Sequence, residues 1–160
     1  MKKAVYIFGA ALALAACTPK GADNTQQTET PAQEARAAAS QYAPMADDGK
    51  VMVLEDSNIY APGVKVPQLT ILDFNAVWCG PCRQLAPVLD ELAIKYEGRV
   101  TFVSVDVDKF GGLFDAYRMG DAIPAVLFLF PDGSQKRYIG TGDLLPGNKF
   151  EALIDAALAK

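Results

Sequence analysis

The sequence predicts an α/β domain over residues 51–160, in which a central mixed β-sheet is flanked by helices. Two observations predict this class. Apolar runs that suit buried strands alternate with segments of helical spacing, and the chain closes with a hairpin pattern and one more helix. The composition also suits a globular core, since 51% of the residues are hydrophobic. A chain of 160 residues is long enough for one domain with appendages.

The first half of the domain is predicted to hold two strands and a long helix. Residues 51–54 are typical of a short strand, and two prolines and a glycine within 56–67 keep any helix there short or broken. Leu69–Phe74 is largely apolar, as a strand covered on both faces would be. Pro81–Tyr96 has apolar residues at helical spacing and is followed by Gly98, which predicts the long helix.

The second half is predicted to continue as strand, helix, hairpin and helix. Val100–Val107 alternates as a strand does, and Phe110–Met119 predicts a helix that its two adjacent glycines weaken. Ala125–Phe130 is fully apolar and is followed by the turn residues Pro-Asp-Gly-Ser. A strand over Lys136–Ile139 and an amphipathic helix over Phe150–Leu158 complete the domain.

The composition excludes several classes of function. The chain has no histidine, so Ser-His or Cys-His catalysis, histidine-ligated zinc or haem, and an imidazole pH switch are all excluded. Fifteen Lys and Arg against nineteen Asp and Glu give a net charge of -4. Because nucleic-acid-binding proteins usually carry a basic surface, we expect no nucleic-acid partner.

The N-terminus is predicted to be the signal peptide of a bacterial lipoprotein. Two lysines precede an apolar run that is shorter than the 18 or so residues a membrane-spanning helix needs. The run ends in Leu-Ala-Ala-Cys, which resembles a lipobox, so we expect cleavage after residue 16 and lipidation of Cys17. Several acyl chains, at ~0.8 kcal/mol per buried methylene, make a firm membrane anchor. The alternative is an ordinary secretory signal with an incidental cysteine.

Residues 17–50 are predicted to form a flexible tether behind the lipidated Cys17. From residue 18 to residue 50 there is no Val, Ile, Leu, Phe or Trp, so this stretch cannot bury enough apolar surface to offset its ordering entropy. A coil of about 30 residues has a root-mean-square reach of roughly 30 Å. The expected organisation is therefore signal peptide 1–16, lipidated cysteine and tether 17–50, and folded domain 51–160.

The chemistry is expected in Trp78-Cys79-Gly80-Pro81-Cys82, between a buried strand and the start of a helix. Two thiols at this spacing can close a small disulfide ring. The helix N-terminus favours a thiolate at Cys79, which we expect to be the more accessible nucleophile. Cys82 lies about one turn further in and can attack a mixed disulfide on Cys79. A structural disulfide and half of a zinc site are the alternatives.

Here the sequence resembles the thioredoxin family. Residues 78–82 match the active-site pentapeptide of that family, and the resemblance extends over residues 51–160. Further matches fall in register: Asp73 with the buried aspartate, Pro87 with the proline of the long helix, Pro124 with the cis-proline, and Asp132-Gly133 with the hairpin turn.

The resemblance implies the roles of the site residues. It implies that Cys79 attacks a substrate disulfide, that Cys82 resolves the mixed disulfide, and that Asp73 accepts the proton of Cys82. The two cysteines form a redox-active disulfide in this reading, with no cofactor and no metal. Substrate contacts are expected from Trp78, Gly80, Pro81, Ile123 and Pro124.

The chain also departs from the family pattern. Asn75 stands where an aromatic or bulky residue is common, and Val77 replaces a polar residue. Ser104 stands where a lysine often lies near the buried aspartate, so we expect the pKa of Asp73 to be raised by burial without a compensating cation. One extra residue near Gly120 puts the shape of the loop that faces the active site in question.

The predicted function is a thioredoxin-like reductase on the periplasmic face of a bacterial membrane. The Gly-Pro dipeptide matches thioredoxin-type reductants rather than strong oxidants. We expect a monomer that acts on disulfide-containing proteins and receives electrons from a membrane thiol donor. The alternative, from another class, is a lipid-anchored peptide-binding holdase or assembly factor, for example in cytochrome c maturation, that works without multiple turnover.

Overall fold

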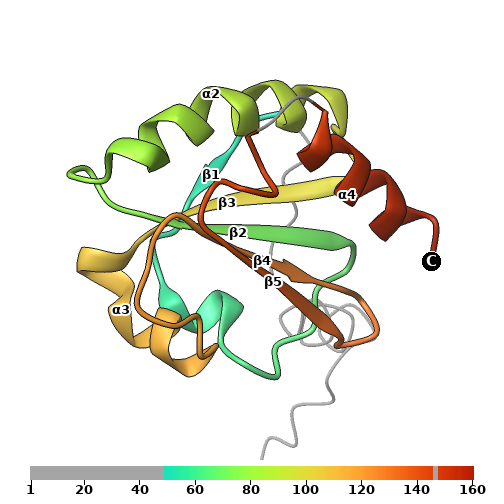
Figure 1. Cartoon of the computed structure of the whole chain (residues 1–160). Helices are drawn as coiled ribbons and strands as arrows, with labels where there is room; N and C mark the ends of the chain where they lie inside the picture. The colour runs from blue at the N-terminus through green and yellow to red at the C-terminus, as the bar shows by residue number, and fades with distance from the viewer. Residues whose placement is uncertain (1–48, 146–147) are drawn as a thin grey trace, which may run out of the picture.

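The computed structural model describes residues 49–145 and 148–160. They form one five-stranded mixed sheet, in the order β1-β3-β2-β4-β5, with helices on both faces (Figure 1). The elements in chain order are β1 (Met52–Val53), the 3-10 helix η1 (Ser57–Tyr60), β2 (Leu69–Asn75), α2 (Gly80–Lys95), β3 (Val100–Asp106), α3 (Val107–Ala116), β4 (Ala125–Leu129), β5 (Gln135–Ile139) and α4 (Lys149–Leu158).

Strand β2 lies at the centre of the sheet. It pairs in parallel with β3 along its whole length, from Leu69 opposite Val100 to Asn75 opposite Asp106. On its other side it pairs antiparallel with β4, which in turn pairs antiparallel with β5. The parallel pair requires a crossover connection, and α2 supplies it. The end of β2 therefore leads directly into the N-terminus of α2.

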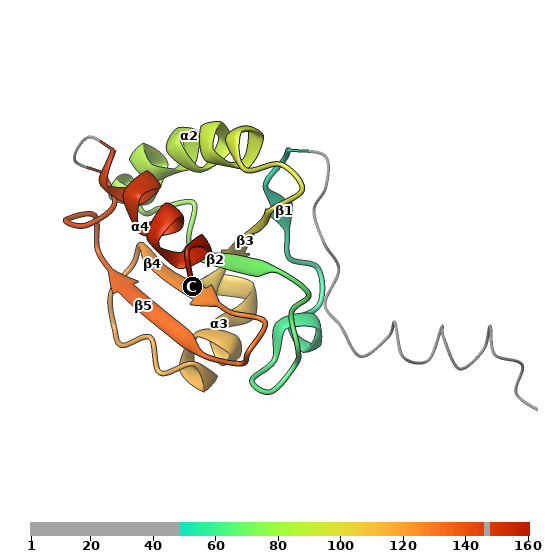
Figure 2. The same ribbon diagram turned by 90° about the vertical axis from the view of Figure 1, so that its right-hand side faces the viewer.

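Helices α2 and α4 cover one face of the sheet, and α3 with η1 covers the other (Figures 1 and 2). Successive side chains of a strand point to opposite faces, and β2 follows this rule. Its Leu69 and Ile71 belong to the core under α2 and α4, and its Leu72 and Phe74 belong to the core over α3. Asp73 lies two residues after Ile71, so its side chain leaves the same face of β2 and points toward α2.

Two elements differ from the sequence-based expectation because of their neighbours. The first strand was expected over residues 51–54, but β1 comprises only Met52 and Val53, since it meets β3 at just two register positions. Strand β3 was expected to alternate, yet its first four residues are all buried. The reason is its interior place between β1 and β2, with packed helices on both faces.

Helix α3 is shifted from its expected bounds of Phe110–Met119. It begins at Val107, because the Asp106 carboxylate accepts a hydrogen bond from the backbone N–H of Asp108 (3.0 Å) and so caps the helix. Phe110 has non-helical backbone angles (φ -120°, ψ 33°) and interrupts the helix before the two glycines. The helix ends at Ala116, three residues earlier than expected.

The other expected strands and helices are present, each within one residue of its expected bounds. Pro87 lies inside α2, and the Ile123-Pro124 peptide bond is cis. The β4–β5 turn is closed by a hydrogen bond from Gly133 N to Phe130 O (2.9 Å), with Gly133 at a φ of 82° that suits glycine. Within residues 49–145 and 148–160, no helix has the length and apolar character to cross a membrane. The expected signal peptide, Cys17 and nearly all of the tether lie outside the described residues.

Candidate active site

The two active-site cysteines lie at the N-terminus of α2, in the segment that follows β2. Cys79 is the N-cap residue of α2, and its Sγ accepts a hydrogen bond from the backbone N–H of Cys82 at 3.2 Å. Pro81 falls in the first turn of the helix, where a missing backbone donor costs nothing. The Cys82 amide at this helix end therefore contacts the sulfur of Cys79, and together with the helix dipole it stabilises negative charge there.

Cys79 and Cys82 form a disulfide with a Cα–Cα distance of 5.3 Å. In this oxidised form each cysteine is only 4% exposed, so the expectation that Cys79 is the more accessible thiol of the reduced protein stays a prediction. Both pack in a small cluster with Ala76, against which Val107 and Ile123 also lie. The two cysteines therefore do not differ in their exposure in the disulfide form.

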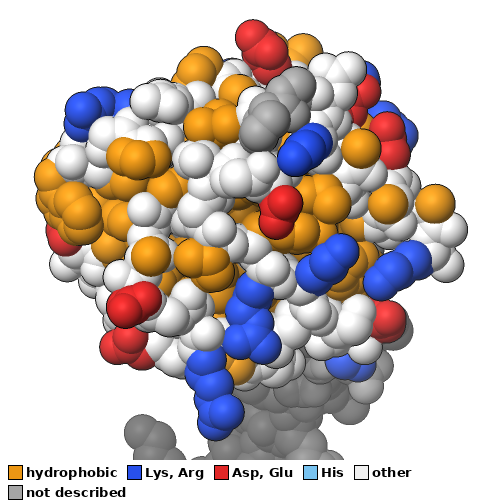
Figure 3. Space-filling view, in the orientation of Figure 1, with side chains coloured by type: hydrophobic (Ala, Val, Ile, Leu, Met, Phe, Trp, Pro, Cys, Tyr) orange, Lys and Arg blue, Asp and Glu red, His pale blue; other side chains and the backbone are white. Residues whose placement is uncertain are grey.

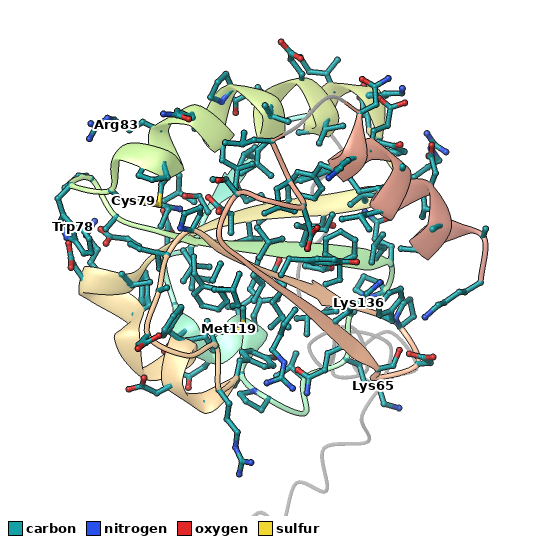
Figure 4. The ribbon with its side chains drawn as sticks, viewed as in Figure 1. Lys65, Trp78, Cys79, Arg83, Met119 and Lys136 are labelled. Atoms are coloured by element: carbon teal, nitrogen blue, oxygen red, sulfur yellow. A yellow bond between two sulfur atoms is a disulfide. The ribbon has the colours of Figure 1, made fainter. Side chains whose placement is uncertain are left out.

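Around the disulfide the surface is apolar and exposed. Val77 is 81% exposed and Trp78 is 64% exposed, and hydrophobic atoms gather at this end of the molecule (Figure 3). The indole Nε1 of Trp78 donates a hydrogen bond to Asp108 Oδ2 at 2.9 Å, which holds the ring beside Cys79 (Figure 4). Asp108 was not among the residues predicted from the sequence. It is 30 residues from Trp78 in the chain, and nothing in the local pattern marks it.

A groove brings two of the expected substrate-contact residues together. It has a volume of about 240 Å³, and its lining includes both Trp78 and Ile123. Pro124 is buried at the start of β4, where its carbonyl oxygen accepts a hydrogen bond from Gly140 N at 2.8 Å. Gly80 and Pro81 lie at the start of α2, beside Cys79. All five expected contact residues therefore lie at one end of the domain.

Asp73 is the buried titratable group of this site. It is 5% exposed, and burial raises its pKa to about 7, since removal from water disfavours the charged form. A hydrogen bond from Asn75 Nδ2 to its Oδ2 (3.0 Å) acts in the opposite direction. Its Oδ1 has no hydrogen-bond partner among the described residues. The raised pKa expected from the sequence is confirmed in direction.

Asp73 and Cys82 line the same cavity, and Trp78 is not part of its lining. The cavity has a volume of about 340 Å³, and Cys79 is not part of its lining. Its other polar lining residues are Asn75, Arg83, Asp90 and Ser104. Arg83 reaches back across the β2–α2 loop, where its Nη1 donates to Val77 O at 3.1 Å (Figure 4). A proton leaving Cys82 can therefore reach Asp73 through the cavity that both residues line.

No group of three or more Cys, Asp or Glu side chains comes together in the described part of the chain in a way that could hold a metal ion. The candidate site consists of a disulfide at a helix start, an exposed aromatic residue next to it and a buried carboxyl that shares a cavity with Cys82.

Comparison with known proteins gives the family. The thioredoxin family model matches residues 50–155. The chain belongs to the thioredoxin family. A thioredoxin of Borreliella burgdorferi is 38% identical over 84 residues, which cover 52% of this chain and 68% of that protein. Thioredoxin-1 of Drosophila melanogaster is 32% identical over 89 residues, which cover 56% of this chain and 82% of that protein.

Longer relatives and a solved structure extend the comparison. Protein disulfide isomerase-like 5-3 of rice is 40% identical over 106 residues, but the match covers only 24% of that protein. The crystal structure of chloroplastic thioredoxin z superimposes with a TM-score of 0.59 at 28% identity, covering 69% of this chain and 96% of that one. The predicted thioredoxin fold is confirmed. The family and the Cys79–Cys82 pair together support disulfide oxidoreductase activity.

Proposed function

We propose that this thioredoxin-family protein reduces disulfide bonds of extracytoplasmic proteins with its Cys79/Cys82 dithiol. The observation that carries the proposal is the placement of the pair. One sulfur caps a helix beside an exposed tryptophan, and the other shares a cavity with a buried carboxyl of raised pKa. This arrangement supplies a nucleophile, a docking surface and a proton acceptor within one site.

The proposed reaction begins from the reduced protein. The Cys79 thiolate attacks one sulfur of a substrate disulfide, so that a mixed disulfide forms and the other substrate sulfur leaves as a thiolate. Cys82 then loses its proton to the Asp73 carboxylate, through a water molecule in the shared cavity. The Cys82 thiolate attacks the sulfur of Cys79 and releases the second substrate sulfur. Two electrons have passed to the substrate, and the protein is left with the Cys79–Cys82 disulfide.

The direction of electron flow is proposed from the residues between the cysteines. A Gly-Pro dipeptide is typical of thioredoxin, whose reduction potential near -270 mV makes it a reductant, whereas strong oxidants lie near -120 mV. Outside the cytoplasm, each turnover would leave the protein oxidised. A membrane thiol donor would have to return two electrons before the next cycle.

We expect the wild-type protein to catalyse the reduction of insulin disulfides by dithiothreitol, measured as the appearance of turbidity when the insulin B chain precipitates. The double variant Cys79→Ser/Cys82→Ser should show only the uncatalysed rate, because it cannot form a mixed disulfide. A peptide-binding holdase would use the apolar surface around Trp78 and would affect turbidity equally with or without the thiols. Equal curves for the two proteins would therefore favour the holdase over the reductase.

The proposed location rests on the N-terminal residues. Cys17 follows Leu-Ala-Ala at the end of a short apolar run, and a polar stretch separates it from the folded domain. A domain held in this way acts on substrates within reach of a membrane surface. The tether length proposed above, roughly 30 Å of root-mean-square reach, sets that distance.

Replacing Cys17 with alanine is expected to abolish lipid attachment. In a bacterial host supplied with radiolabelled palmitate, the wild-type chain should carry the label and sediment with membranes. The Cys17→Ala chain should carry no label and should either appear in the soluble fraction or remain uncleaved. A wild-type chain that stays with the membrane without any acyl label would contradict the anchor. Cys79→Ala is the matched control, since loss of a different cysteine should leave labelling unchanged.

A further inference from the structure

The side chain of Asn75 makes three polar contacts at the end of β2. Its Nδ2 lies 3.0 Å from Asp73 Oδ2, 3.0 Å from Asp73 O and 2.8 Å from Ser104 Oγ. An amide nitrogen carries two hydrogens, so these three acceptors share two donors. Asn75 is therefore fixed between the carboxyl of Asp73 and the neighbouring strand.

The sheet register creates this arrangement. Asn75 follows Asp73 by two residues, so both side chains leave the same face of β2. Strand β3 runs parallel to β2 and places Ser104 directly opposite Asp73. The hydroxyl of Ser104 and the carboxyl of Asp73 thus flank the amide from adjacent strands. One oxygen of Asp73 is held, while Oδ1 is left without a partner among the described residues.

We propose that Asn75, braced by Ser104, is a positioning residue that holds Asp73 ready to take the proton of Cys82. The proposal rests on the proposed role of Asp73 and adds to it the residues that orient this carboxyl. The amide binds Oδ2 and leaves Oδ1 as the oxygen that exchanges protons within the cavity shared with Cys82. Because an amide donor carries no charge, it keeps this function at any pH at which the thiols react.

The charged and titratable groups around Asp73 are few. Besides Cys82, α2 contributes Arg83 and Asp90 to the cavity, while Val53 of β1 and Val51 just before that strand are apolar. The guanidinium of Arg83 donates a hydrogen bond to the carbonyl oxygen of Val77 rather than to the carboxyl of Asp73.

The hydrogen bond from Asn75 stabilises the charged form of Asp73 and lowers its pKa, whereas burial raises it. Ser104, on β3, is neutral. Among the described residues Asn75 is thus the donor that keeps the carboxylate available near neutral pH.

Asn75→Leu removes the amide while keeping a side chain of similar size. The rate of the resolving step, followed by stopped flow from a preformed mixed disulfide, should keep its plateau at high pH. The acid limb of this pH–rate profile should shift to higher pH by about one unit. At pH values well below the midpoint, the resolving step should therefore be roughly tenfold slower. The first step, attack by Cys79, should be unchanged. Ser104→Ala should produce a smaller shift in the same direction, and Ser104→Thr, which keeps the hydroxyl, should produce none.

A direct titration separates this proposal from the role of Asp73. The 13C chemical shift of the Asp73 side-chain carboxyl, followed against pH, should give a higher pKa in Asn75→Leu and, to a lesser extent, in Ser104→Ala. Unchanged titration in both variants would overturn the positioning role, whatever the kinetics. If instead the titration shifts but Asp73→Asn resolves mixed disulfides at the wild-type rate, Asn75 positions Asp73 and the proton acceptor of Cys82 lies elsewhere.

A double-mutant comparison completes the test. In a chain that already carries Asp73→Asn, the further change Asn75→Leu should leave the pH profile of resolution unaltered, because no carboxyl remains to be positioned. An equal shift in the presence and absence of Asp73 would mean that Asn75 acts on the thiols by another path and would overturn the proposal. Far-ultraviolet circular dichroism checks that each variant is folded. If Asn75→Leu does not fold, the test is made with Ser104→Ala instead.

Discussion

Cys82→Ala is expected to accumulate a stable mixed disulfide with substrate, whereas Cys79→Ala should accumulate none. In the first variant Cys79 can still attack a disulfide, but no internal thiol remains to release the product. In the second variant the remaining thiol is Cys82, which lines the cavity that it shares with Asp73. Cys79 has the hydrogen bond from the helix N-terminus that stabilises a thiolate, so it should attack first.

The measurement is a non-reducing gel of each variant after incubation with oxidised insulin, with the adducts identified by mass spectrometry. Both variants should also carry Cys17→Ala, so that the third thiol of the chain cannot contribute. The double variant Cys79→Ala/Cys82→Ala provides the background. If adducts formed on Cys82 when Cys79 is absent, and none formed on Cys79, the nucleophile and the resolving thiol would have to be exchanged.

Asp73→Asn is expected to stabilise the protein at pH 8 and to leave its stability near pH 4 almost unchanged. The pKa of Asp73 is about 7 in the folded protein, against about 3.9 in an unfolded chain. Between these values unfolding releases a proton, so the free energy of unfolding falls as the pH rises and levels off above pH 7. Asparagine cannot ionise, so the substitution removes this loss in the free energy of unfolding. A pKa difference of about three units corresponds to a loss of up to about 4 kcal/mol. Urea unfolding at pH 4, 6 and 8 measures the difference.

The same substitution should slow resolution of the mixed disulfide near neutral pH and leave the first attack nearly intact. Asp90→Asn is the matched control, because Asp90 lines the same cavity but is exposed, and it should change neither stability nor resolution. If Asp73→Asn destabilised the protein at pH 8, or slowed both chemical steps equally, Asp73 would not be the proton acceptor. A stability difference that did not grow with pH would show that its carboxyl has no raised pKa.

The elements that could be predicted from the sequence are those with a strong local pattern. The apolar run of β2 and the helical spacing of α2 were both evident, and the cysteine motif lies between them. The start of α3 was less evident, because it depends on a cap formed by Asp106 at the end of β3 rather than on apolar spacing. The shortness of β1 was also hidden, since the length of an edge strand is set by its partner.

The site shows the same division. The positions of Cys79, Cys82 and Asp73 could be taken from the sequence, and so could the direction of the pKa shift. The contact between Asn75 and Ser104 could not, because it depends on the register of β2 against β3, which joins residues 29 positions apart. Asn75 therefore appeared only as a departure from the family pattern, with no partner to explain it.

The central place of β2 in the sheet separates two kinds of proton movement at Asp73. Its backbone amide belongs to a strand that is paired on both sides and covered on both faces, and such amides exchange hydrogen with solvent only through large-scale opening of the fold. Its carboxyl faces a cavity and needs no such opening. Side-chain motions occur in nanoseconds and opening of a stable core takes minutes or longer. The backbone amide of Asp73 therefore stays protected from hydrogen exchange, while its side-chain carboxyl can transfer protons during each catalytic cycle.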